Sequence, residues 1–415
     1  MSVIYKEVKV ISPSSPFHNK IVDILIKDGV INTIAEQINA GSETVINLKG
    51  SNVSCGWIDI FANFCTPGKE QNETLASGSK AAASGGFTDV FLVPNTKPCN
   101  SGSAITSFIK SHNYGVNLHP VGAVTKECEG VDLAEMYDMK NAGAVAFSDG
   151  SKNISSTAIM LKALQYLIPI DSVLIQNAHD HHLFKDGLMN EGIASTKFGM
   201  PSIPAIAEKM LIQRDIDLLQ YTNSKLHITG VSTKKSIELI KEAKNKGLNI
   251  TCSATPYHCF FIDENLHSYN TNLKVFPPLR DIKDREALKI ALADGTIDCI
   301  ASHHEPVKDD DKLKEFEYAL PGMSTLQSVY SVLNSFISNQ ERIVELFTKA
   351  EQIFNLQRPK FAEGNIACLT FFNENESFIF TADKNFSLSN NNAFLNIPLK
   401  GTVKGIHNST FTFFN

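Results

Sequence analysis

Two short segments of the chain concentrate the side chains that could do metal chemistry. Three histidines fall within residues 179–182, and His303 and His304 are adjacent. Neutral imidazole nitrogens, together with a carboxylate, are ligands that zinc accepts readily. One metal ion could therefore be held between these segments, and the candidate ligands are Asp149, His179, His181 and His303.

The same residues also fit a role without a metal. A metal site requires defined ligand geometry and hydrogen-bonded support behind each ligand, whereas residues 179–182 are expected in a loop. We therefore interpret these histidines as surface or hydrogen-bonded side chains and expect no metal ion, with the one-metal site as the alternative. The aspartates at 309–311, which have lysines beside them, are likewise typical of a solvated loop.

The composition excludes several classes of protein. The 415 residues are 43% hydrophobic and 20% charged, with a formal net charge of −6. A disordered chain would be less apolar, and a nucleic-acid binder would be more basic. No apolar run approaches the ~18 residues of a membrane helix, and the first residues are not typical of a targeting peptide. The eight cysteines lack any Cys-x-x-Cys spacing, so we expect reduced thiols in a cytoplasmic protein without nucleic-acid or membrane partners.

Two patterns of apolar residues divide the chain. Residues 1–54 and 364–415 alternate with a period of two and predict short strands, which suggests one small β-sandwich domain assembled from both termini. Residues 55–363 alternate strand-like apolar runs with amphipathic helical patterns, as in a parallel sheet covered by helices. The strand-like runs are residues 57–64, 90–94, 116–124, 145–148, 173–176, 226–231, 250–254 and 297–301.

Eight such runs predict a (β/α)8 barrel, with an open, doubly wound α/β sheet as the alternative. No Gly-x-Gly-x-x-Gly or Walker loop follows any run, which disfavours a nucleotide-binding open sheet. In a barrel, the chemistry lies where the strands end and the following loops begin. The ends of five of the predicted strands carry Asn95, Asp149, Asn177, Gly230 and His303.

Seven ordered blocks run through the chain, and they are Gly56-Trp57-Ile58-Asp59, Gly85-Gly86-Phe87-Thr88, Val93-Pro94-Asn95-Thr96, Gly143-Ala144-Val145-Ala146-Phe147-Ser148-Asp149, Thr255-Pro256-Tyr257-His258, Pro277-Pro278-Leu279-Arg280 and Gly295-Thr296-Ile297-Asp298. Together they resemble the dihydroorotases of the amidohydrolase superfamily. The resemblance implies a metal-dependent-hydrolase barrel with a β-sandwich from both termini. It also implies a hydrolase of pyrimidine biosynthesis that uses two zinc ions to interconvert carbamoyl aspartate and dihydroorotate.

The resemblance breaks where the family binds metal. The two histidines after its first barrel strand are replaced by phenylalanine and asparagine, and those after its fifth and sixth strands by asparagine and glycine. Phenylalanine offers no lone pair, and an amide is a poor zinc ligand. The family aspartate that serves as ligand and proton carrier is His303 here, so no catalytic residue is predicted. The family's ligand positions in this chain are Phe61, Asn63, Asp149, Asn177, Gly230 and His303.

The substrate contacts implied by the resemblance are also depleted. The arginine that binds the substrate carboxylate is Cys65, the asparagine before the Pro-Pro-Leu-Arg block is Phe276, and the histidine that ends the eighth-strand block is Val307. The substrate-binding candidates that remain are Asn95 and His304. Three of the replacements at the barrel mouth are apolar, namely Phe61, Phe276 and Val307. They predict a closed, dry pocket.

These losses predict a pseudoenzyme. Resemblance to the non-catalytic members of the family, the pseudo-dihydroorotases, implies a structural or regulatory partner of aspartate transcarbamoylase, a homodimer, or both, with no cofactor. The alternative is an active dihydroorotase or related cyclic amidase, which would hydrolyse dihydroorotate to carbamoyl aspartate. Such an enzyme would need zinc at a relocated or single-metal site.

Overall fold

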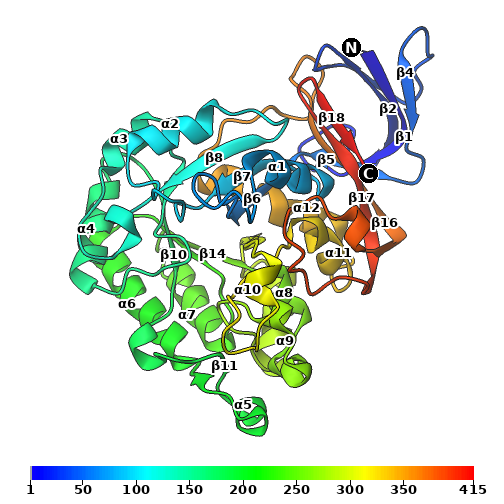
Figure 1. Cartoon of the computed structure of the whole chain (residues 1–415). Helices are drawn as coiled ribbons and strands as arrows, with labels where there is room; N and C mark the ends of the chain where they lie inside the picture. The colour runs from blue at the N-terminus through cyan, green and yellow to red at the C-terminus, as the bar shows by residue number, and fades with distance from the viewer. Residues whose placement is uncertain (1) are drawn as a thin grey trace.

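The computed structural model describes residues 2–415, which form a barrel and a separate sheet (Figure 1). Eight parallel strands follow one another around the barrel in chain order, apart from a short two-stranded excursion, so the predicted (β/α)8 architecture is confirmed. The barrel strands are β6 (Trp57–Ala62), β7 (Phe87–Leu92), β8 (Asn117–Gly122), β9 (Ala146–Phe147), β10 (Leu174–Asn177), β13 (Leu226–Thr229), β14 (Ile250–Ala254) and β15 (Cys299–Ile300), and the excursion is β11 (Met189–Asn190) with β12 (Ser202–Ile203).

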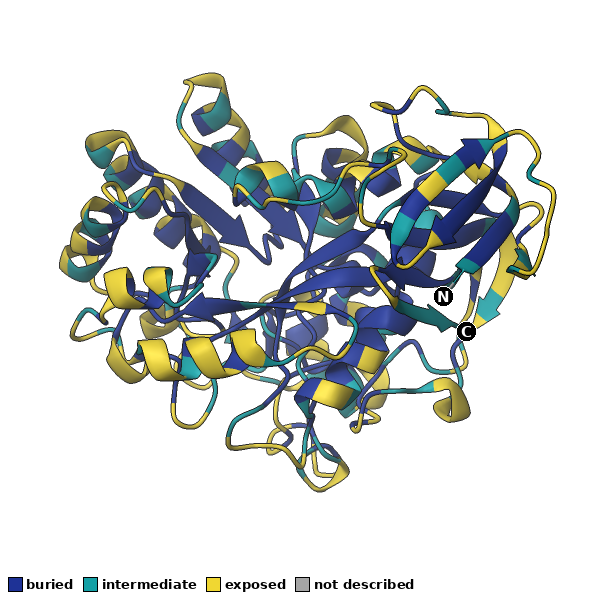
Figure 2. Ribbon diagram, turned by 90° about the horizontal axis from the view of Figure 1, so that it is seen from above, coloured by how far each residue is buried: buried dark blue, intermediate teal, exposed yellow. Residues whose placement is uncertain are grey.

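Helices surround these strands, and Figure 2 shows buried strands inside with the exposed helix faces outside. Helix α1 illustrates why the sequence begins and ends them where it does. Thr74 caps its first turn by accepting from the backbone N–H of Ser77, and Gly85 ends it. The helices are α1 (Leu75–Ser84), α2 (Ser103–Ser111), α3 (Met136–Asn141), α4 (Thr157–Leu167), α5 (Ile193–Phe198), α6 (Ile206–Thr222), α7 (Lys234–Asn245), α8 (Pro256–Phe260), α9 (Ile282–Asp294), α10 (Asp309–Lys312), α11 (Val329–Asn334), α12 (Gln340–Thr348) and α13 (Ala350–Ile353).

The seam between β6 and β15 is closed just beyond the ends of the two strands. Ala62 forms a parallel bridge with His304, and the backbone N–H of Asn63 donates to the carbonyl of His304 at 2.8 Å. This seam brings the residues after the first and last barrel strands side by side. It therefore places Phe61 next to His303, although 242 positions separate them in the sequence.

The second sheet contains strands from both ends of the chain, as predicted, and both termini lie on it (Figure 1). Its strand order is β18-β17-β16-β5-β1-β2-β3, with β4 paired to β1. The domain boundaries at residues 54/55 and 363/364 stay a prediction. The strands are β1 (Ser2–Val10), β2 (Ile21–Lys27), β3 (Val30–Ala35), β4 (Thr44–Asn47), β5 (Asn52–Cys55), β16 (Cys368–Ile379), β17 (Pro398–Asn408) and β18 (Phe411–Phe414).

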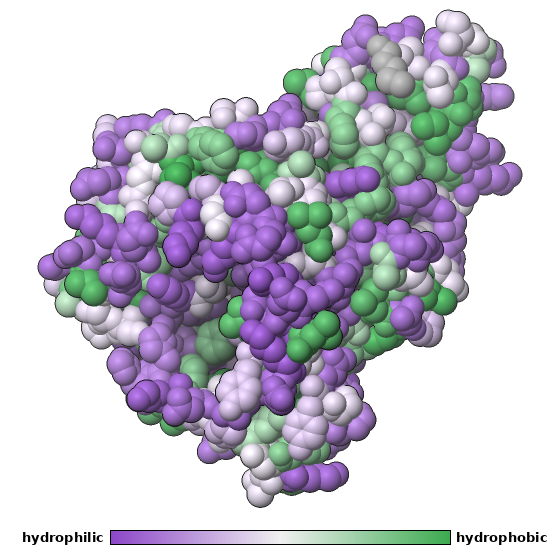
Figure 3. Space-filling model, in the orientation of Figure 1, coloured by the Kyte–Doolittle hydropathy of each residue, from purple (hydrophilic) through white to green (hydrophobic). Residues whose placement is uncertain are grey.

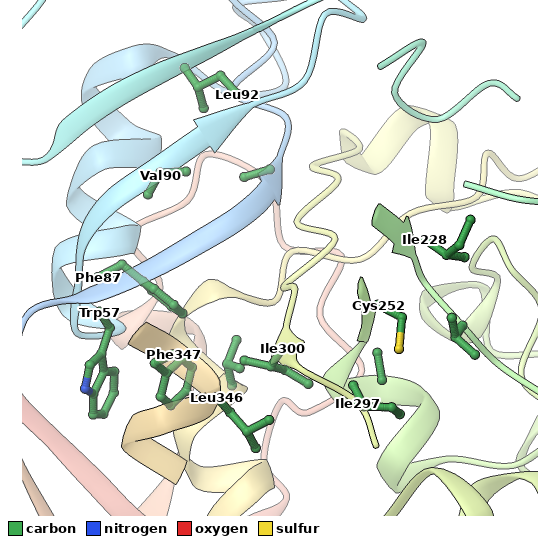
Figure 4. Packing of buried hydrophobic residues seen from close by; sticks show 14 of the residues in the cluster. Trp57, Phe87, Val90, Leu92, Ile228, Cys252, Ile297, Ile300, Leu346 and Phe347 are labelled. Atoms are coloured by element: carbon green, nitrogen blue, oxygen red, sulfur yellow. The ribbon is translucent and has the colours of Figure 1, made fainter. Parts of the chain in front are cut away.

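An aromatic cluster holds the barrel and the sheet together. The buried ring of Trp57 stacks on Phe347 of α12 at 4.3 Å between centroids and contacts Phe87 of β7 (Figure 4). It also contacts Phe372 of β16. Its indole N–H donates to Ser54 at 3.0 Å. Buried aromatic pairs of this kind add about 0.5–1.5 kcal/mol each beyond the burial of their apolar area. In the described residues, no helix is long and apolar enough to cross a membrane.

Candidate functional site at the barrel mouth

His303 occupies the centre of the barrel mouth. Its ring stacks on Phe61 with 4.2 Å between centroids and 20° between planes, and its Nε2 lies 2.8 Å from the hydroxyl of Thr229. Burial, helped by the nearby His258 and His227, lowers the pKa of His303 to about 3. The imidazole is therefore neutral at pH 7 and is held by a ring contact and a hydrogen bond.

The glycine after β13 makes room for this histidine. A Cβ atom on Gly230 would lie 2.8 Å from Cε1 of His303, closer than packed side chains approach. Gly230 also has a φ of +67°, a region that L-residues with a side chain rarely adopt. A histidine at position 230 and the observed ring position of His303 are therefore incompatible.

A chain of hydrogen bonds continues from His303 into the barrel. Thr229 accepts from Ser253 at 2.9 Å, and Ser253 lies 3.0 Å from Nε2 of His227. The other nitrogen of His227 lies 2.8 Å from the hydroxyl of Thr251, and burial lowers the pKa of His227 to about 3. These partners give His227 a structural role.

The side chains of Asp149 and Asn63 form hydrogen bonds that hold neighbouring loops. The carboxylate of Asp149 accepts from the N–H groups of Val124 and Thr125 at 3.0 and 2.9 Å, and from the Thr125 hydroxyl at 2.6 Å. The amide of Asn63 donates to Glu305 at 2.9 Å, and its oxygen accepts from a backbone N–H at 2.8 Å. Both side chains therefore already have hydrogen-bond partners within the protein.

The histidines at 179–182 differ in their exposure to solvent. His181 and His182 are exposed, as expected for a surface loop. His179 is 1% exposed, and neither of its ring nitrogens makes a hydrogen bond within residues 2–415. His179 is therefore not a surface side chain, and its only close polar neighbour in the described residues is Glu208. Its ring is enclosed between Glu208, with Nε2 3.4 Å from a carboxylate oxygen, and Phe276, because α6 and the segment before Pro277 converge on it.

The four candidate ligands for a single metal are not brought together. Asp149 caps a loop, His181 lies at the surface, His179 faces Glu208, and His303 is bonded to a threonine. Within residues 2–415, no group of three or more histidine, cysteine or acidic side chains could hold a metal ion.

A two-zinc centre at the family positions does not fit these residues either. Phe61 and Gly230 have no donor atom, and the two asparagines offer neutral amides, which bind zinc poorly. The carboxylate that remains, Asp149, already accepts three hydrogen bonds. The chemistry of the donor set therefore disagrees with the metal content that the resemblance implies.

The side chains of the two predicted substrate-binding residues also have polar contacts within the protein. Asn95 donates to the carbonyl of Asp149 at 3.0 Å and accepts from the N–H of Ser151 at 2.8 Å. His304 is 2% exposed, accepts from a backbone N–H at 3.1 Å, and lies 3.4 Å from the carboxylate of Glu73. Neither residue lines the cavity at the mouth, and their assignment to substrate binding stays a prediction.

The expectation of a closed pocket is wrong, because a cavity of about 300 Å³ remains at the mouth. Its walls include Phe61, Phe276 and Val307, the apolar residues that were expected to fill it. Phe61 lies flat on His303, and Phe276 leans toward His179, so the rings line the space instead of occupying it. A second cavity of about 750 Å³ lies beside it, and the surface over α10 is largely hydrophilic (Figure 3).

Three charged residues that support the mouth were not predicted from the sequence. Glu208 accepts from the N–H groups of Ser232 and Thr233, both at 3.1 Å, and Arg280 lies 3.5 Å from its carboxylate. Glu73 receives hydrogen bonds from residues more than 300 positions away. Arg280 ends one of the family-like blocks, which is a usable signal, but no motif marks the two glutamates.

Comparisons with known proteins agree with this geometry at the level of the fold and the family. A family model described as dihydro-orotase-like matches residues 50–236. A dihydroorotase of Syntrophus aciditrophicus is 34% identical over 97% of both chains, and one of Geobacter sulfurreducens is 41% identical over 79% of this chain and 78% of its own. An L-hydantoinase (dihydropyrimidinase) structure from Arthrobacter aurescens superposes with a TM-score of 0.86 at 21% identity, covering 99% of this chain and 95% of that one.

Proposed function

The chain belongs to the dihydroorotase family, and from that premise we propose that it serves pyrimidine biosynthesis as a non-catalytic member. In this role it keeps the barrel and the terminal sheet as a scaffold and binds aspartate transcarbamoylase, as a monomer or a homodimer. The eight free cysteines support a cytoplasmic location, where thiols stay reduced.

The observation that carries the proposal is the donor set at the family's metal positions. Opening or closing a cyclic amide near neutral pH needs a strong nucleophile, which the family's metal ions supply as bound hydroxide, and a group that moves the proton. Two of the six positions here have no donor atom, and the carboxylate that remains is occupied by backbone and hydroxyl donors.

His303 is a weak replacement for the family aspartate as a proton carrier. With its pKa lowered to about 3, it takes up a proton only in strongly acidic solution. Its Nε2 already shares a hydrogen bond with Thr229, and the ring stacks on Phe61. These contacts hold the imidazole in place, and burial lowers its pKa, which together support a structural role.

The test is turnover by the purified full-length chain. Hydrolysis of dihydroorotate and condensation of carbamoyl aspartate are measured with and without added zinc, beside the Geobacter sulfurreducens dihydroorotase as a positive control. We expect no rate above the uncatalysed reaction and less than about 0.1 zinc per chain. Zinc-dependent turnover of either substrate contradicts the proposal.

A second candidate is an active dihydroorotase or cyclic amidase with zinc at a relocated or single-metal site. The printed names of the relatives favour it, because each of those cited is called a dihydroorotase. It requires His179 and His303 to leave their present partners and converge on one ion. Zinc near one per chain, with turnover lost in both His179→Ala and His303→Ala, would support this candidate.

The partner role has its own experiment. The tagged chain is expressed in its native cell and recovered, and the recovered protein is assayed for aspartate transcarbamoylase activity. We expect that activity to co-purify, and the enzyme's assembled fraction to fall when the chain is deleted. Recovery of the chain alone, as a monomer or a homodimer, together with unchanged transcarbamoylase assembly, contradicts the role.

A further inference from the structure

We propose that Cys99 and Cys128 are the two halves of a reversible disulfide, which forms when a peroxide oxidises the pair and which ties together two loops of the barrel. Cys99 lies in the loop between β7 and α2, and Cys128 lies in the loop between β8 and α3. The inference goes beyond the proposed function, because it concerns thiol chemistry away from the family's metal positions and holds whether or not the chain is catalytic.

The two sulfur atoms are already in contact. The Sγ atoms of Cys99 and Cys128 lie 3.0 Å apart, and both cysteines are free. A disulfide bond is about 2.05 Å long, so the sulfurs need to approach each other by only about 1 Å. In the described part of the chain, no other two cysteine sulfurs are in hydrogen-bond contact. Proximity therefore selects this pair from the eight cysteines of the sequence.

Hydrogen bonds beside both cysteines fix the two loops relative to each other. The carbonyl of Asn100, the residue after Cys99, accepts from the backbone N–H of Ala123 at 2.8 Å. The backbone N–H of Cys128 donates to the carbonyl of Thr125 at 3.0 Å, and Thr125 is itself held by a buried carboxylate. The backbone on each side of the contact therefore determines where the two sulfurs lie.

The backbone at Cys128 has an unusual conformation. Cys128 and the preceding Glu127 have φ values of +54° and +51°, a region that residues with a side chain rarely adopt. Such a conformation persists only where the surrounding structure holds it, and it is found most often at sites with a function. The turn formed by these two residues carries the Cys128 sulfur that contacts Cys99.

The surroundings favour the reduced pair until an oxidant arrives. The hydrogen bond with Cys99, together with burial, raises the pKa of the Cys128 thiol. Since cysteines react as thiolates, a raised pKa slows oxidation by weak oxidants. Both cysteines are buried, but Cys128 lines the cavity of about 750 Å³ beside the barrel mouth, through which a molecule as small as hydrogen peroxide can approach.

The oxidation proceeds in two displacements. The thiolate of one cysteine attacks an oxygen of hydrogen peroxide, so that an S–O bond forms, the O–O bond breaks and hydroxide leaves. The second thiolate attacks the resulting sulfenic acid, which forms the S–S bond and releases another hydroxide. The two thiol protons convert both hydroxides to water, so the two sulfurs are oxidised and the peroxide is reduced. A dithiol reverses the reaction by thiol–disulfide exchange, because it becomes a disulfide itself and returns two protons to the cysteines.

Peptide mapping of the full-length protein tests the proposal. The reduced protein is treated with a small excess of hydrogen peroxide, alkylated and digested with trypsin without reductant. Trypsin releases residues 81–110 and 127–140, which carry Cys99 and Cys128 as their only cysteines. We expect mass spectrometry to find these two peptides joined, and free thiols to fall from eight to six per chain. Dithiothreitol should undo both changes.

Three outcomes of this experiment overturn the inference. They are eight thiols left after peroxide treatment, oxidation that ends at sulfinic or sulfonic acid, and a disulfide that joins other cysteines. The wild-type peptide map gives this answer without any variant.

Variants add a matched control. Cys99→Ser and Cys128→Ser should each form no disulfide under the same treatment. Cys55→Ser removes the one cysteine that is not fully buried, and it should still form the 99–128 crosslink and lose two of its seven thiols. A disulfide in Cys99→Ser, or a crosslink that disappears in Cys55→Ser, would show that exposure and not proximity selects the reacting cysteines, and would contradict the proposal.

Discussion

Buried polar groups have different contacts at the two ends of the barrel. At the floor, where the strands begin, Asp89 accepts from Arg358 and from His119, both at 2.8 Å. At the mouth, Glu208 lies 3.5 Å from Arg280 and 3.4 Å from His179. Burial would raise the pKa of Asp89, but Arg358 and His119 outweigh it and lower the value. Short contacts with a cation and a histidine therefore hold the floor carboxylate ionised, whereas Glu208 at the mouth takes its shorter hydrogen bonds from Ser232 and Thr233.

The unpartnered atoms sharpen this contrast. At the floor, one nitrogen each of His119 and Arg358 lacks a hydrogen bond, but both side chains are anchored to Asp89 through another atom. At the mouth, His179 makes no side-chain hydrogen bond within residues 2–415, and the Asn177 oxygen has no partner there. The floor thus has the contacts of a stability element, whereas the described residues at the mouth leave buried polar atoms without hydrogen bonds.

The largest effect is expected at the floor. Arg358→Leu leaves the carboxylate of Asp89 buried without its cation, so the free energy of unfolding should fall by about 3–5 kcal/mol. Urea denaturation measures the change. The control is Lys235→Leu, in an exposed pair with Glu238, which should change stability by less than about 1 kcal/mol. Similar losses in the two variants would contradict the role of the floor pair.

Acid should destabilise the mouth through His303. Its folded pKa of about 3 lies below the ordinary value of 6.5. Between these values the unfolded chain binds more protons, so this histidine makes stability rise with pH and fall on acidification. Relative to His303→Gln, the wild-type protein should lose about 2 kcal/mol between pH 7.5 and pH 5. A constant difference between the two proteins across this range would contradict a buried, neutral His303.

A smaller effect is expected at Gly230. Gly230→Ala introduces a methyl group 2.8 Å from His303 at a φ of +67°, whereas Gly247→Ala, at +79°, meets no atom within 4 Å. Both variants carry the strain of a left-handed residue, about 1 kcal/mol. The first should lose about 1–2 kcal/mol more, because His303 must move. Thermal unfolding compares the two variants. Equal losses of stability would mean that the His303 ring moves aside without a cost in free energy.

The smallest effect is expected at Asn177. Since its oxygen makes no hydrogen bond within residues 2–415, Asn177→Leu should change the free energy of unfolding by less than about 1 kcal/mol, with stabilisation as the expected sign. Equilibrium denaturation in the absence of ligand measures it. A loss of several kcal/mol would show that the amide has a structural partner and would remove the contrast between the two ends of the barrel.

Residue patterns were sufficient to predict the architecture. The run at residues 250–254 became β14, and one of the amphipathic helical patterns between the runs became α7, with Ile237, Ile240 and Ala243 buried. The family-like blocks likewise located Phe61 and Gly230 at the mouth. These features follow from burial along one strand or helix, so a short window of sequence contains the necessary information.

The partners of the polar side chains could not be predicted in the same way. The engagement of Asp149 depends on Thr125, the position of His303 depends on Phe61 and Gly230, and Glu73 is held by the segment near residue 387. Each contact joins elements that are distant in sequence and meet only when the barrel closes. Residue identity at a position could therefore indicate that the family's ligand type was absent, but the three-dimensional packing was needed to show that a cavity of about 300 Å³ remains among the apolar residues of the mouth.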